Sequence, residues 1–331
     1  MNNKRLRVYY IGQTLGGIRD IKTTLDKVGA DLFTLDHIDD ESELISRIID
    51  ADGLITVYTP ITRRVFSKLK NCKAVLRTGV GFDVVDIEAA TEFGVAVINV
   101  PDMWTQEVAN QALTLLLACN RKLLTVDSNV RKGDWSDIIP GKVGPLYGET
   151  LGVIGVGRIG SAFARRVAML DLNIIGYDPY TSSELFKQLN IEQASLVELL
   201  SRSDYVSIHC PLNEETHHMI NESMLNLMKP TAYLINTARG AIIDEEALIK
   251  ALHQGVIAGA GLDAFEIEPP KPINALLKMK NVVLSAHVGH FSDASMARRP
   301  KRFGEEIARV FSGQTPINLV NLEVNDKLNL K

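Results

Sequence analysis

Three glycines constrain the fold of this chain more than any other feature of its sequence. Gly155, Gly157 and Gly160 are spaced G-x-G-x-x-G, directly after the apolar run Leu151–Ile154 and at the start of a helical pattern. In such a strand–turn–helix the first glycine permits a tight turn, the second lets the backbone approach a pyrophosphate, and the third allows close helix–strand packing. The helix N-terminus then offers free N–H groups to phosphates. The pattern predicts a dinucleotide-binding unit.

An acidic residue downstream supports this interpretation. Asp178 ends the next apolar run, Ile174–Tyr177, where a carboxylate can accept both hydroxyls of a ribose. A 2′-phosphate would be repelled there, and no Arg or Lys occurs over residues 179–186 to offset the charge. We therefore expect NAD as the cofactor rather than NADP. A glycine turn with no ligand is the alternative.

Short β-rich runs alternate with helical stretches along the whole chain, which indicates parallel sheets. A length of 331 residues allows about two domains, and 46% apolar with 23% charged residues is typical of a globular protein. A single long helix is expected over Gln106–Val130, with one doubly wound sheet before it and another after it. The expected strands are residues 7–11, 31–36, 53–57, 73–77, 95–99, 151–155, 173–177, 205–209, 233–236, 258–262 and 282–285.

Composition excludes several classes of partner. There are 36 basic and 40 acidic residues, so the net charge of −4 gives no basic surplus for nucleic acid. The basic run Arg298–Arg302 is expected to be a solvated helix face, kinked or started at Pro300, rather than a nucleic-acid patch. No secretory leader and no membrane span is apparent, so we expect no membrane partner. Three dispersed cysteines predict a reducing, cytoplasmic setting.

A metal site is the less favoured interpretation of the histidines and is not predicted. His209, Cys210, His217 and His218, or His287 with His290, have spacings that permit ligation. However, His209 and Cys210 are neighbours on a strand end, where successive side chains point in opposite directions.

A second glycine turn lies upstream, at Gly79–Gly81. Val84 occupies the place of the third glycine, so this segment does not match the dinucleotide motif. We expect an anion-binding turn with inward N–H groups at Val80 and Gly81, a plain turn being the alternative.

Three reactive side chains follow the late strands, where open α/β sheets place their ligands. Arg239 can bind a carboxylate through two hydrogen bonds. His287 is a proton donor suited to neutral pH, and Glu268 is a carboxylate that could pair with it and favour its charged form. Each residue alone is weak evidence for an active site, because loop Arg and Glu side chains are usually solvated and a His can be buried in a core.

Taken together, these segments resemble the D-isomer-specific 2-hydroxyacid dehydrogenase family over roughly Lys73 to Asn321. The matching segments are Arg77–Asp83, Asn99–Asp102, Leu151–Gly160, His209–Leu212, Asn236–Gly240, Asp263–Pro270 and Pro316–Asn321. The resemblance implies a Rossmann-type NAD-binding domain over residues 102–289, inserted in a flavodoxin-like α/β substrate domain made of 1–101 and 290–331. It also implies a homodimer, with the long helix and the following loop at its interface.

The resemblance further implies the reaction and the role of each residue. A hydride would pass between nicotinamide C4 and C2 of a small 2-oxo or 2-hydroxy acid, while His287, paired with Glu268, moves the proton. Arg77, Val80, Gly81 and Arg239 would bind the substrate. The implied cofactor contacts are Gly155, Gly157, Arg158, Ile159, Gly160, Asp178, Cys210, Pro211, Thr216, Thr237, Ala238, Asp263 and Gly289.

Some positions depart from the family pattern. Ala286 stands where Pro is common before the His, and Asn110 stands where the long helix usually carries an acid. Arg77 and the stretch His290–Ser292 resemble the branch of C-terminal binding protein, a co-repressor. An NADH-sensing binding protein with little turnover is therefore the alternative function.

Overall fold

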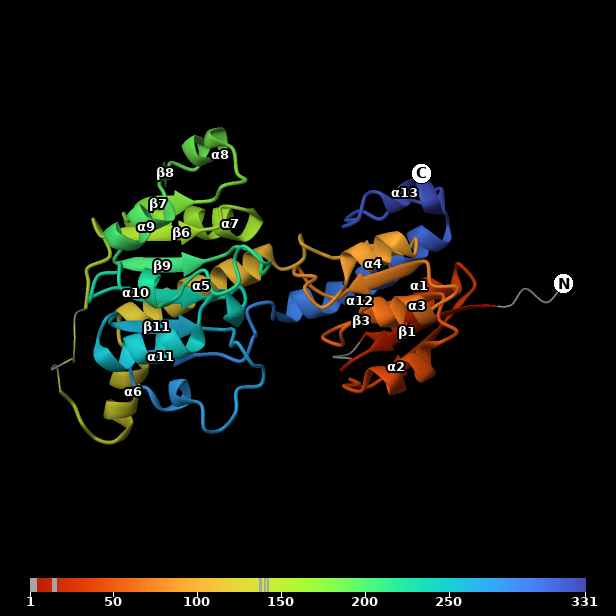
Figure 1. The fold of residues 1–331 in the computed structure, drawn as a ribbon. Helices are drawn as coiled ribbons and strands as arrows, with labels where there is room; N and C mark the ends of the chain where they lie inside the picture. Colours follow the sequence, from red (N-terminus) through yellow and green to blue (C-terminus); the bar gives the residue numbers. More distant parts are fainter. Residues whose placement is uncertain (1–4, 14–16, 137–138, 140, 142) are drawn as a thin grey trace. The chain divides into compact units, whose positions relative to one another are not determined.

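The computed structural model describes residues 5–13, 17–136, 139, 141 and 143–331 (Figure 1). The chain forms two compact units. The first unit consists of Met1–Met103 and Phe291–Lys331, and the second unit is Trp104–His290. The boundaries expected from the sequence, after residue 101 and before residue 290, lie within two residues of these.

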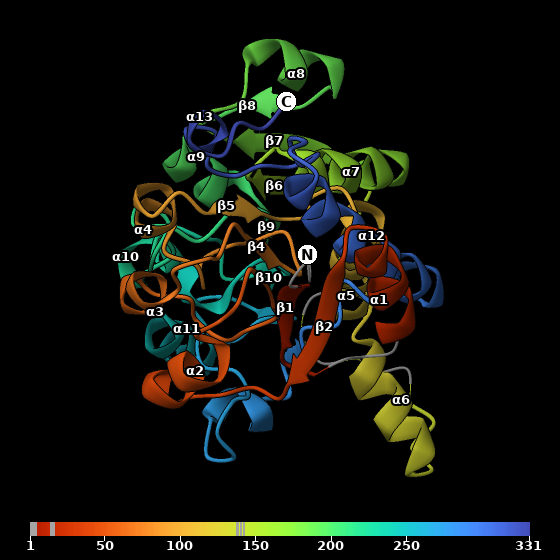
Figure 2. The ribbon, with the colours of Figure 1, turned by 90° about the vertical axis from the view of Figure 1, so that its right-hand side faces the viewer.

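The first unit is built on a parallel sheet with strand order β2-β1-β3-β4-β5. This is the flavodoxin-like order. Helices α2, α3 and α4 pack on one face of the sheet, and α1 and α12 on the other (Figure 2). The elements are β1 Leu6–Ile11, α1 Ile18–Asp26, β2 Ala30–Leu35, α2 Glu41–Ile48, β3 Gly53–Thr56, α3 Arg63–Lys68, β4 Ala74–Arg77, α4 Ile87–Glu92, β5 Ala96–Ile98, α12 Asp293–Phe311 and α13 Val324–Leu328.

Short polar side chains start the helices on one face of this sheet. Asp40, Thr62 and Asp86 each accept a hydrogen bond from the backbone N–H three residues later, at the start of α2, α3 and α4. Such caps satisfy N–H groups that the helix itself leaves unpaired.

The second unit contains a seven-stranded parallel sheet with order β12-β11-β10-β9-β6-β7-β8. The order reverses between β6 and β9, as in a Rossmann-type sheet, so the predicted fold class is confirmed. The elements are α5 Thr105–Asn120, α6 Leu123–Arg131, β6 Thr150–Ile154, α7 Arg158–Val167, η1 Ala168–Leu170, β7 Asn173–Tyr177, α8 Ser183–Gln188, β8 Glu192–Gln193, α9 Leu196–Arg202, β9 Tyr205–Ile208, α10 Glu222–Leu225, β10 Tyr233–Asn236, η2 Gly240–Ile242, α11 Glu245–Gln254, β11 Gly259–Leu262, η3 Ala275–Lys278 and β12 Val282–Leu284.

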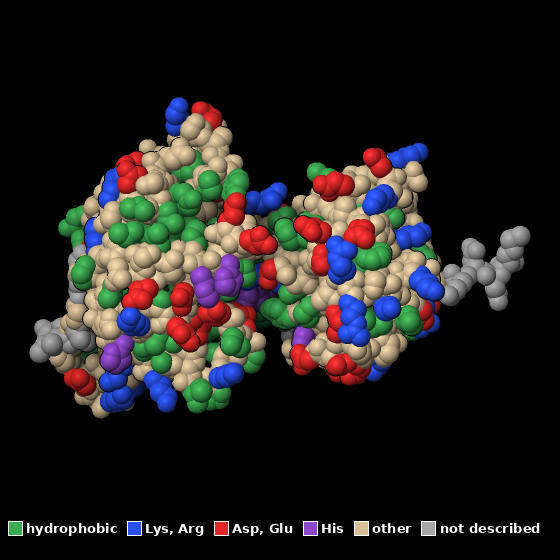
Figure 3. All heavy atoms as spheres, in the orientation of Figure 1, with side chains coloured by type: hydrophobic (Ala, Val, Ile, Leu, Met, Phe, Trp, Pro, Cys, Tyr) green, Lys and Arg blue, Asp and Glu red, His purple; other side chains and the backbone are tan. Residues whose placement is uncertain are grey.

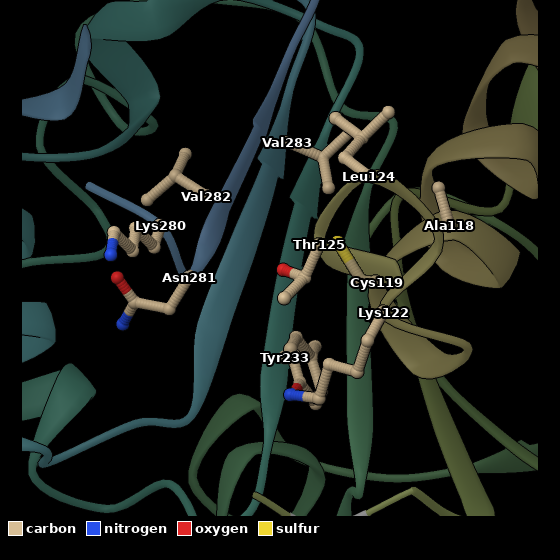
Figure 4. Close-up of a pocket in the computed structure, with 10 residues that line it drawn as sticks. All are labelled: Ala118, Cys119, Lys122, Leu124, Thr125, Tyr233, Lys280, Asn281, Val282 and Val283. Carbon is tan, nitrogen blue, oxygen red and sulfur yellow. The ribbon is translucent and has the colours of Figure 1, made fainter. Parts of the chain in front are cut away.

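The prediction of a single helix over 106–130 is wrong. Helix α5 ends at Asn120 and α6 begins at Leu123, because Lys122 between them adopts a left-handed backbone with φ of 52°. The Lys122 ammonium lies 4.6 Å from the centre of the Tyr233 ring and hydrogen-bonds its hydroxyl. Figure 4 shows this contact at a small pocket that Cys119 and Val283 also line. A contact between residues distant in sequence therefore overrides the continuous apolar pattern.

The basic run Arg298–Arg302 is only partly the solvated face that we expected. It lies inside α12, and Arg299 and Pro300 are buried. Arg298 donates to the Met103 carbonyl at 2.5 Å, and Arg302 lies 2.8 Å from the Glu306 carboxylate. The helix continues through Pro300, whose ring packs where a Cβ on Gly17 would lie. On the face shown in Figure 3, acidic and basic side chains are interspersed over the first unit.

Among the residues that the structure describes, no helix is both long and apolar enough to cross a membrane.

The C-terminal segment covers the edge strand β5. The Val320 N–H donates to the Val97 carbonyl at 2.8 Å, and the Val97 N–H donates to Asn321 Oδ1 at 2.8 Å. The Asn321 amide also donates to the Val95 carbonyl at 2.9 Å, and its side chain is buried. The last motif matched in the sequence therefore closes the first sheet, since an exposed strand edge is prone to mispairing.

Replacing Asn321 with Ala should lower the free energy of unfolding by about 2–3 kcal/mol, because a buried backbone N–H loses its acceptor. Urea denaturation measures the loss, and hydrogen exchange at the β5 amides locates it. Asn318→Ala is the matched control, since the Asn318 amide makes a long bond of 3.4 Å to Asp102 near the surface. Equal stability of the two variants would contradict this role of Asn321.

Candidate active site

The glycine turn follows β6 and leads into α7, as the motif predicts. Gly155 has φ of +87°, and a Cβ there would lie 2.6 Å from the Cys210 backbone nitrogen. A Cβ on Gly160 would lie 2.0 Å from the Gly155 carbonyl oxygen, so only glycine permits this approach of helix to turn. Gly157 is exposed, with open space where its Cβ would be.

The N-terminus of α7 is open to a ligand. Arg158 and Ile159 are its first two residues, and no side chain among the described residues caps it. Uncapped N–H groups at a helix start bind anions such as phosphate. Together with the open face of Gly157, this end of α7 fits a dinucleotide pyrophosphate.

Asp178 sits at the mouth of the same turn, directly after β7. Its Oδ2 accepts from the Val156 N–H at 2.8 Å, and its Oδ1 accepts from the N–H groups of Tyr180 and Thr181 at 2.9 and 3.1 Å. These bonds fix the carboxylate beside the glycine turn. The Tyr180 hydroxyl hydrogen-bonds Glu215, which places a second acid on the loop after β9 that faces the Asp178 loop.

The loop after β9 lies against the turn through Cys210. Its exposed end is shaped by Thr216, whose hydroxyl donates to the Pro211 carbonyl at 2.6 Å and accepts from the Asn213 N–H at 2.9 Å. The Thr216 hydroxyl therefore fixes the loop. Cys210 is largely enclosed, and burial raises the pKa of its thiol to about 12.

The histidines considered for a metal do not gather into a site. Burial lowers the pKa of His209 to about 3, and its Nε2 lies 2.9 Å from the Ser207 hydroxyl. His217 and His218 stack on each other, with ring centres 4.0 Å apart, and His218 pairs with Glu266 at 2.9 Å. Within the described part of the chain, no three His, Cys, Asp or Glu side chains are arranged to hold a metal ion.

The loop after β10 carries Thr237, Ala238 and Arg239. The Asn236 side chain braces this loop, because it donates to the Arg239 carbonyl at 2.8 Å and accepts from the Ala238 N–H at 2.9 Å. The Thr237 hydroxyl is buried and has no hydrogen-bond partner among the residues that the structure describes. A buried hydroxyl without a partner is costly, so it suits a site that a polar ligand completes.

His287 and Glu268 form the predicted pair. His287 Nδ1 lies 2.7 Å from Glu268 Oε2, and their side chains are 24% and 31% exposed. The other oxygen of Glu268 accepts from the Phe265 N–H at 3.0 Å. Burial raises the pKa of Glu268, but the His287 hydrogen bond and charge, the Phe265 N–H and the charge of Arg239 outweigh it, so the pKa lies below its ordinary value.

Asp263 and Gly289 hold the loop that carries His287. The Asp263 carboxylate is buried and accepts from the Val288 N–H at 3.0 Å, the Gly289 N–H at 2.8 Å and the Ser285 hydroxyl at 2.6 Å. The Gln111 side chain donates in turn to the Ser285 hydroxyl at 2.9 Å. Sequence reasoning missed Ser285 and Gln111. The signal available was a polar residue in an apolar helix and a hydroxyl two residues before the His.

The candidate substrate residues of the first unit lie at the end of β4 and in the turn after it. Arg77 is buried, and its guanidinium lies where a Cβ on Gly79 would be and 5.9 Å from the Tyr58 ring centre. The next residues, Val80 and Gly81, are half-buried, and the Val80 carbonyl accepts from the Asn99 amide at 2.7 Å. The buried Arg77 guanidinium therefore packs against the turn at Gly79.

Ala286 and Asn110 are the two residues that depart from the pattern expected in the sequence. Ala286 is exposed beside His287. Asn110 accepts from Arg166 of α7 at 2.7 Å, so it joins α5 to α7 within this unit.

Known proteins resemble the chain over nearly its whole length. Residues 113–289 match the family described as D-isomer specific 2-hydroxyacid dehydrogenase, NAD binding domain. A glyoxylate reductase of Korarchaeum cryptofilum is 41% identical, over 88% of this chain and 91% of that protein.

Solved structures share the fold as well. A D-lactate dehydrogenase from Aquifex aeolicus, in complex with NAD and lactic acid, has a TM-score of 0.85 at 28% identity and covers 97% of this chain and 98% of its own. An NADPH-dependent glyoxylate/hydroxypyruvate reductase from Sinorhizobium meliloti, in complex with NADP and malonate, has a TM-score of 0.86 at 29% identity and covers 97% and 98%.

These matches agree with the geometry of the second unit, in which a glycine turn, an acid after the next strand and a His–Glu pair gather on one sheet. Their extent leaves no ambiguity about ancestry. The chain is an oxidoreductase acting on a CH–OH group, and it belongs to the D-isomer-specific 2-hydroxyacid dehydrogenase family.

Proposed function

We propose that the chain reduces a small 2-oxoacid to the D-2-hydroxyacid with NADH, and catalyses the reverse reaction with NAD. The observation that carries the proposal is the His287–Glu268 pair at 2.7 Å, in the same group of loops as Arg239. A carboxylate beside an imidazole stabilises its protonated form, which is the form that reduction consumes.

The roles of the three side chains follow from their chemistry. Because Nδ1 of His287 is bonded to Glu268, we assign proton transfer to its Nε2. The Arg239 guanidinium can bind the substrate carboxylate through two hydrogen bonds and draw electron density from the neighbouring keto oxygen. Glu268 holds the imidazole orientation and balances its charge.

The second unit offers a fitting place for the dinucleotide. Gly155, Gly157, Gly160 and the start of α7 would hold the pyrophosphate, and Asp178 the adenosine ribose. We assign the nicotinamide side to Thr237, Ala238, Asp263 and Gly289. Within the described part of the chain the buried Thr237 hydroxyl has no partner, so a polar ligand there would satisfy it. When bound, the nicotinamide supplies or accepts the hydride at C4.

We propose NAD rather than NADP because two acids face the adenosine side. The Asp178 carboxylate is fixed by three backbone N–H groups, and Glu215 is linked to the same loop through Tyr180. A 2′-phosphate placed beside them would meet like charge within the screening length of physiological salt.

The substrate that we propose is a short 2-oxoacid, with glyoxylate first because relatives at about 40% identity are glyoxylate reductases. In the first unit, Arg77 and the N–H groups of Val80 and Gly81 can bind a small carboxylate. Phosphorylated and longer acids are the comparison substrates, since one relative is a D-3-phosphoglycerate dehydrogenase.

We also propose that the protein is a homodimer. Helix α6 buries none of its residues against its own unit, and Leu123 and Leu124 on it are more than half exposed. Trp135, shortly after it, is 90% exposed. Large apolar side chains grouped in this way suit an interface with a second copy.

We place the protein in the cytoplasm. Cys72, Cys119 and Cys210 are all free thiols, as is usual in a reducing compartment.

The activity is tested by mixing NADH with a panel of 2-oxoacids and following absorbance. His287→Asn should lower kcat/KM by about 10²–10⁴-fold, because Asn cannot donate the proton, while the Kd for NADH stays within about threefold. His253→Asn, on an exposed part of α11, is the matched control. Tight NADH binding with no turnover of any acid would contradict the proposal and favour an NADH-sensing binding protein.

The role of Glu268 is tested by pH. The pKa of Glu268 lies below its ordinary value, so its charge is present at neutral pH and is lost only as the pH falls through that lowered value. Glu268→Gln removes the charge at every pH. The profile of kcat for reduction should therefore move to more acid pH, because a neutral amide does not stabilise a protonated imidazole. A profile that keeps its position would show that Glu268 does not act on His287.

Cofactor choice is tested with Asp178→Asn, which keeps the shape of the side chain and removes its charge. The ratio of kcat/KM for NADPH to that for NADH should rise by about 10-fold or more, and NADPH fluorescence should report tighter binding. Glu184→Gln, on exposed α8, controls for the loss of a surface charge. An unchanged ratio would show that Asp178 does not determine the preference for NADH over NADPH.

A further inference from the structure

We propose that Ser285 and Gln111 are positioning residues for His287, acting through the Asp263 carboxylate. The inference rests on the proposed function, in which His287 transfers the proton. It assigns a catalytic consequence to helix α5, which carries none of the residues in the proposed machinery.

The backbone of His287 needs support from its surroundings. Its φ is 53°, in the left-handed region that is unfavourable for a non-glycine residue. Three successive N–H groups, those of His287, Val288 and Gly289, all donate to Asp263, at 2.8 Å to its carbonyl and at 3.0 and 2.8 Å to its carboxylate. One residue therefore holds the whole turn that carries the imidazole.

Asp263 is in turn fixed by Ser285. The Ser285 hydroxyl donates to Asp263 Oδ1 at 2.6 Å, and the Ser285 N–H donates to the Leu262 carbonyl at 2.9 Å, which keeps the parallel ladder of β11 and β12 in register up to this point. The Asp263 side chain is 2% exposed, so water cannot replace a lost partner easily.

The direction of the chain of hydrogen bonds is set by proton count. Ser285 has one hydroxyl proton, and a carboxylate can only accept, so this proton goes to Asp263. The Gln111 amide, 2.9 Å from the Ser285 oxygen, must then be the donor. The relay runs from Gln111 on α5 to Ser285, Asp263 and the His287 turn.

The same helix also packs on the turn directly. A Cβ on Gly289 would lie 2.8 Å from Asp263 Oδ2 and 3.5 Å from the Gln111 Cβ. The turn therefore lies against both Asp263 and Gln111. Loss of the Ser285 hydroxyl leaves the Asp263 carboxylate with the two N–H donors of the turn and without its link to β12, so the carboxylate and the turn are held less firmly. The imidazole then spends less time at the distance that proton transfer requires.

The test measures kcat and KM of the full-length protein with NADH and the best 2-oxoacid. Ser285→Ala and Gln111→Met should each lower kcat by about 5- to 50-fold, with KM for both substrates within about threefold. Ser285→Thr keeps the hydroxyl and should restore most of kcat. Thr114→Ala is the matched control on α5, because the exposed Thr114 hydroxyl bonds back to the Asn110 carbonyl of its own helix.

A double-mutant cycle separates positioning from general damage. Since Gln111 acts through Ser285, the double variant should be no slower than Ser285→Ala alone. Hydrogen exchange at the Val288 and Gly289 amides should quicken in Ser285→Ala.

Three results would overturn the inference while the proposed function stands. They are an active wild type with kcat of Ser285→Ala within twofold, full additivity of the two losses, or a rise in KM for NADH with kcat unchanged. A wild type that reduces no 2-oxoacid would instead overturn the proposed function, and the catalytic role of this relay with it.

Discussion

The second unit depends on one geometric constraint, that all seven of its strands are parallel. Parallel strands end at the same edge, so the segments after β6, β7, β9, β10, β11 and β12 meet there although the chain visits them over more than a hundred residues. The glycine turn, Asp178, the Arg239 loop, Asp263 and His287 all owe their proximity to this edge. Their side chains then need only short, local bonds to be fixed.

The three carboxylates at this edge of the sheet are stabilised by different partners. Glu268 loses solvation on burial, and the His287 and Arg239 charges more than compensate it. Asp263 is buried more deeply and is satisfied by two N–H groups and one hydroxyl. The two carboxylates therefore have different roles. Glu268 pairs with the His287 imidazole, and Asp263 binds the backbone of the turn that carries His287. Asp178, on the other side of the sheet's switch point, is braced by backbone N–H groups alone.

Local patterns in the sequence were sufficient for most strands, for both sheets and for the glycine turn, because period and glycine spacing act over a few residues. The break at Lys122 was not predictable in this way, since Tyr233, which holds Lys122, lies 111 positions away. The burial of Arg299 and Pro300 has the same kind of cause, because helix packing decided it. Short elements such as β8, which is exposed, and α8, in which Phe186 is buried, have too few apolar positions to show a period.

The sequence predicts the reactive residues of the candidate site one by one, but it does not predict the residues that hold them in place. His287 and Glu268 were chosen for their chemistry, and the structure places them 2.7 Å apart. Ser285 and Gln111 carry ordinary polar groups, and their meaning appears only when β11, β12 and α5 come together. The roles given to the cofactor and substrate residues remain predictions.

The most direct test of the account is the configuration of the product. The protein would be supplied with NADH and 2-oxoacids whose reduction creates a stereocentre, such as pyruvate and hydroxypyruvate, and the products would be separated on a chiral column. In the proposed function Arg239 would hold the carboxylate and His287 would protonate the keto oxygen, so hydride would add to one face of the keto carbon and the D-2-hydroxyacid alone should form. The L-acid, or a mixture of both forms, would contradict it.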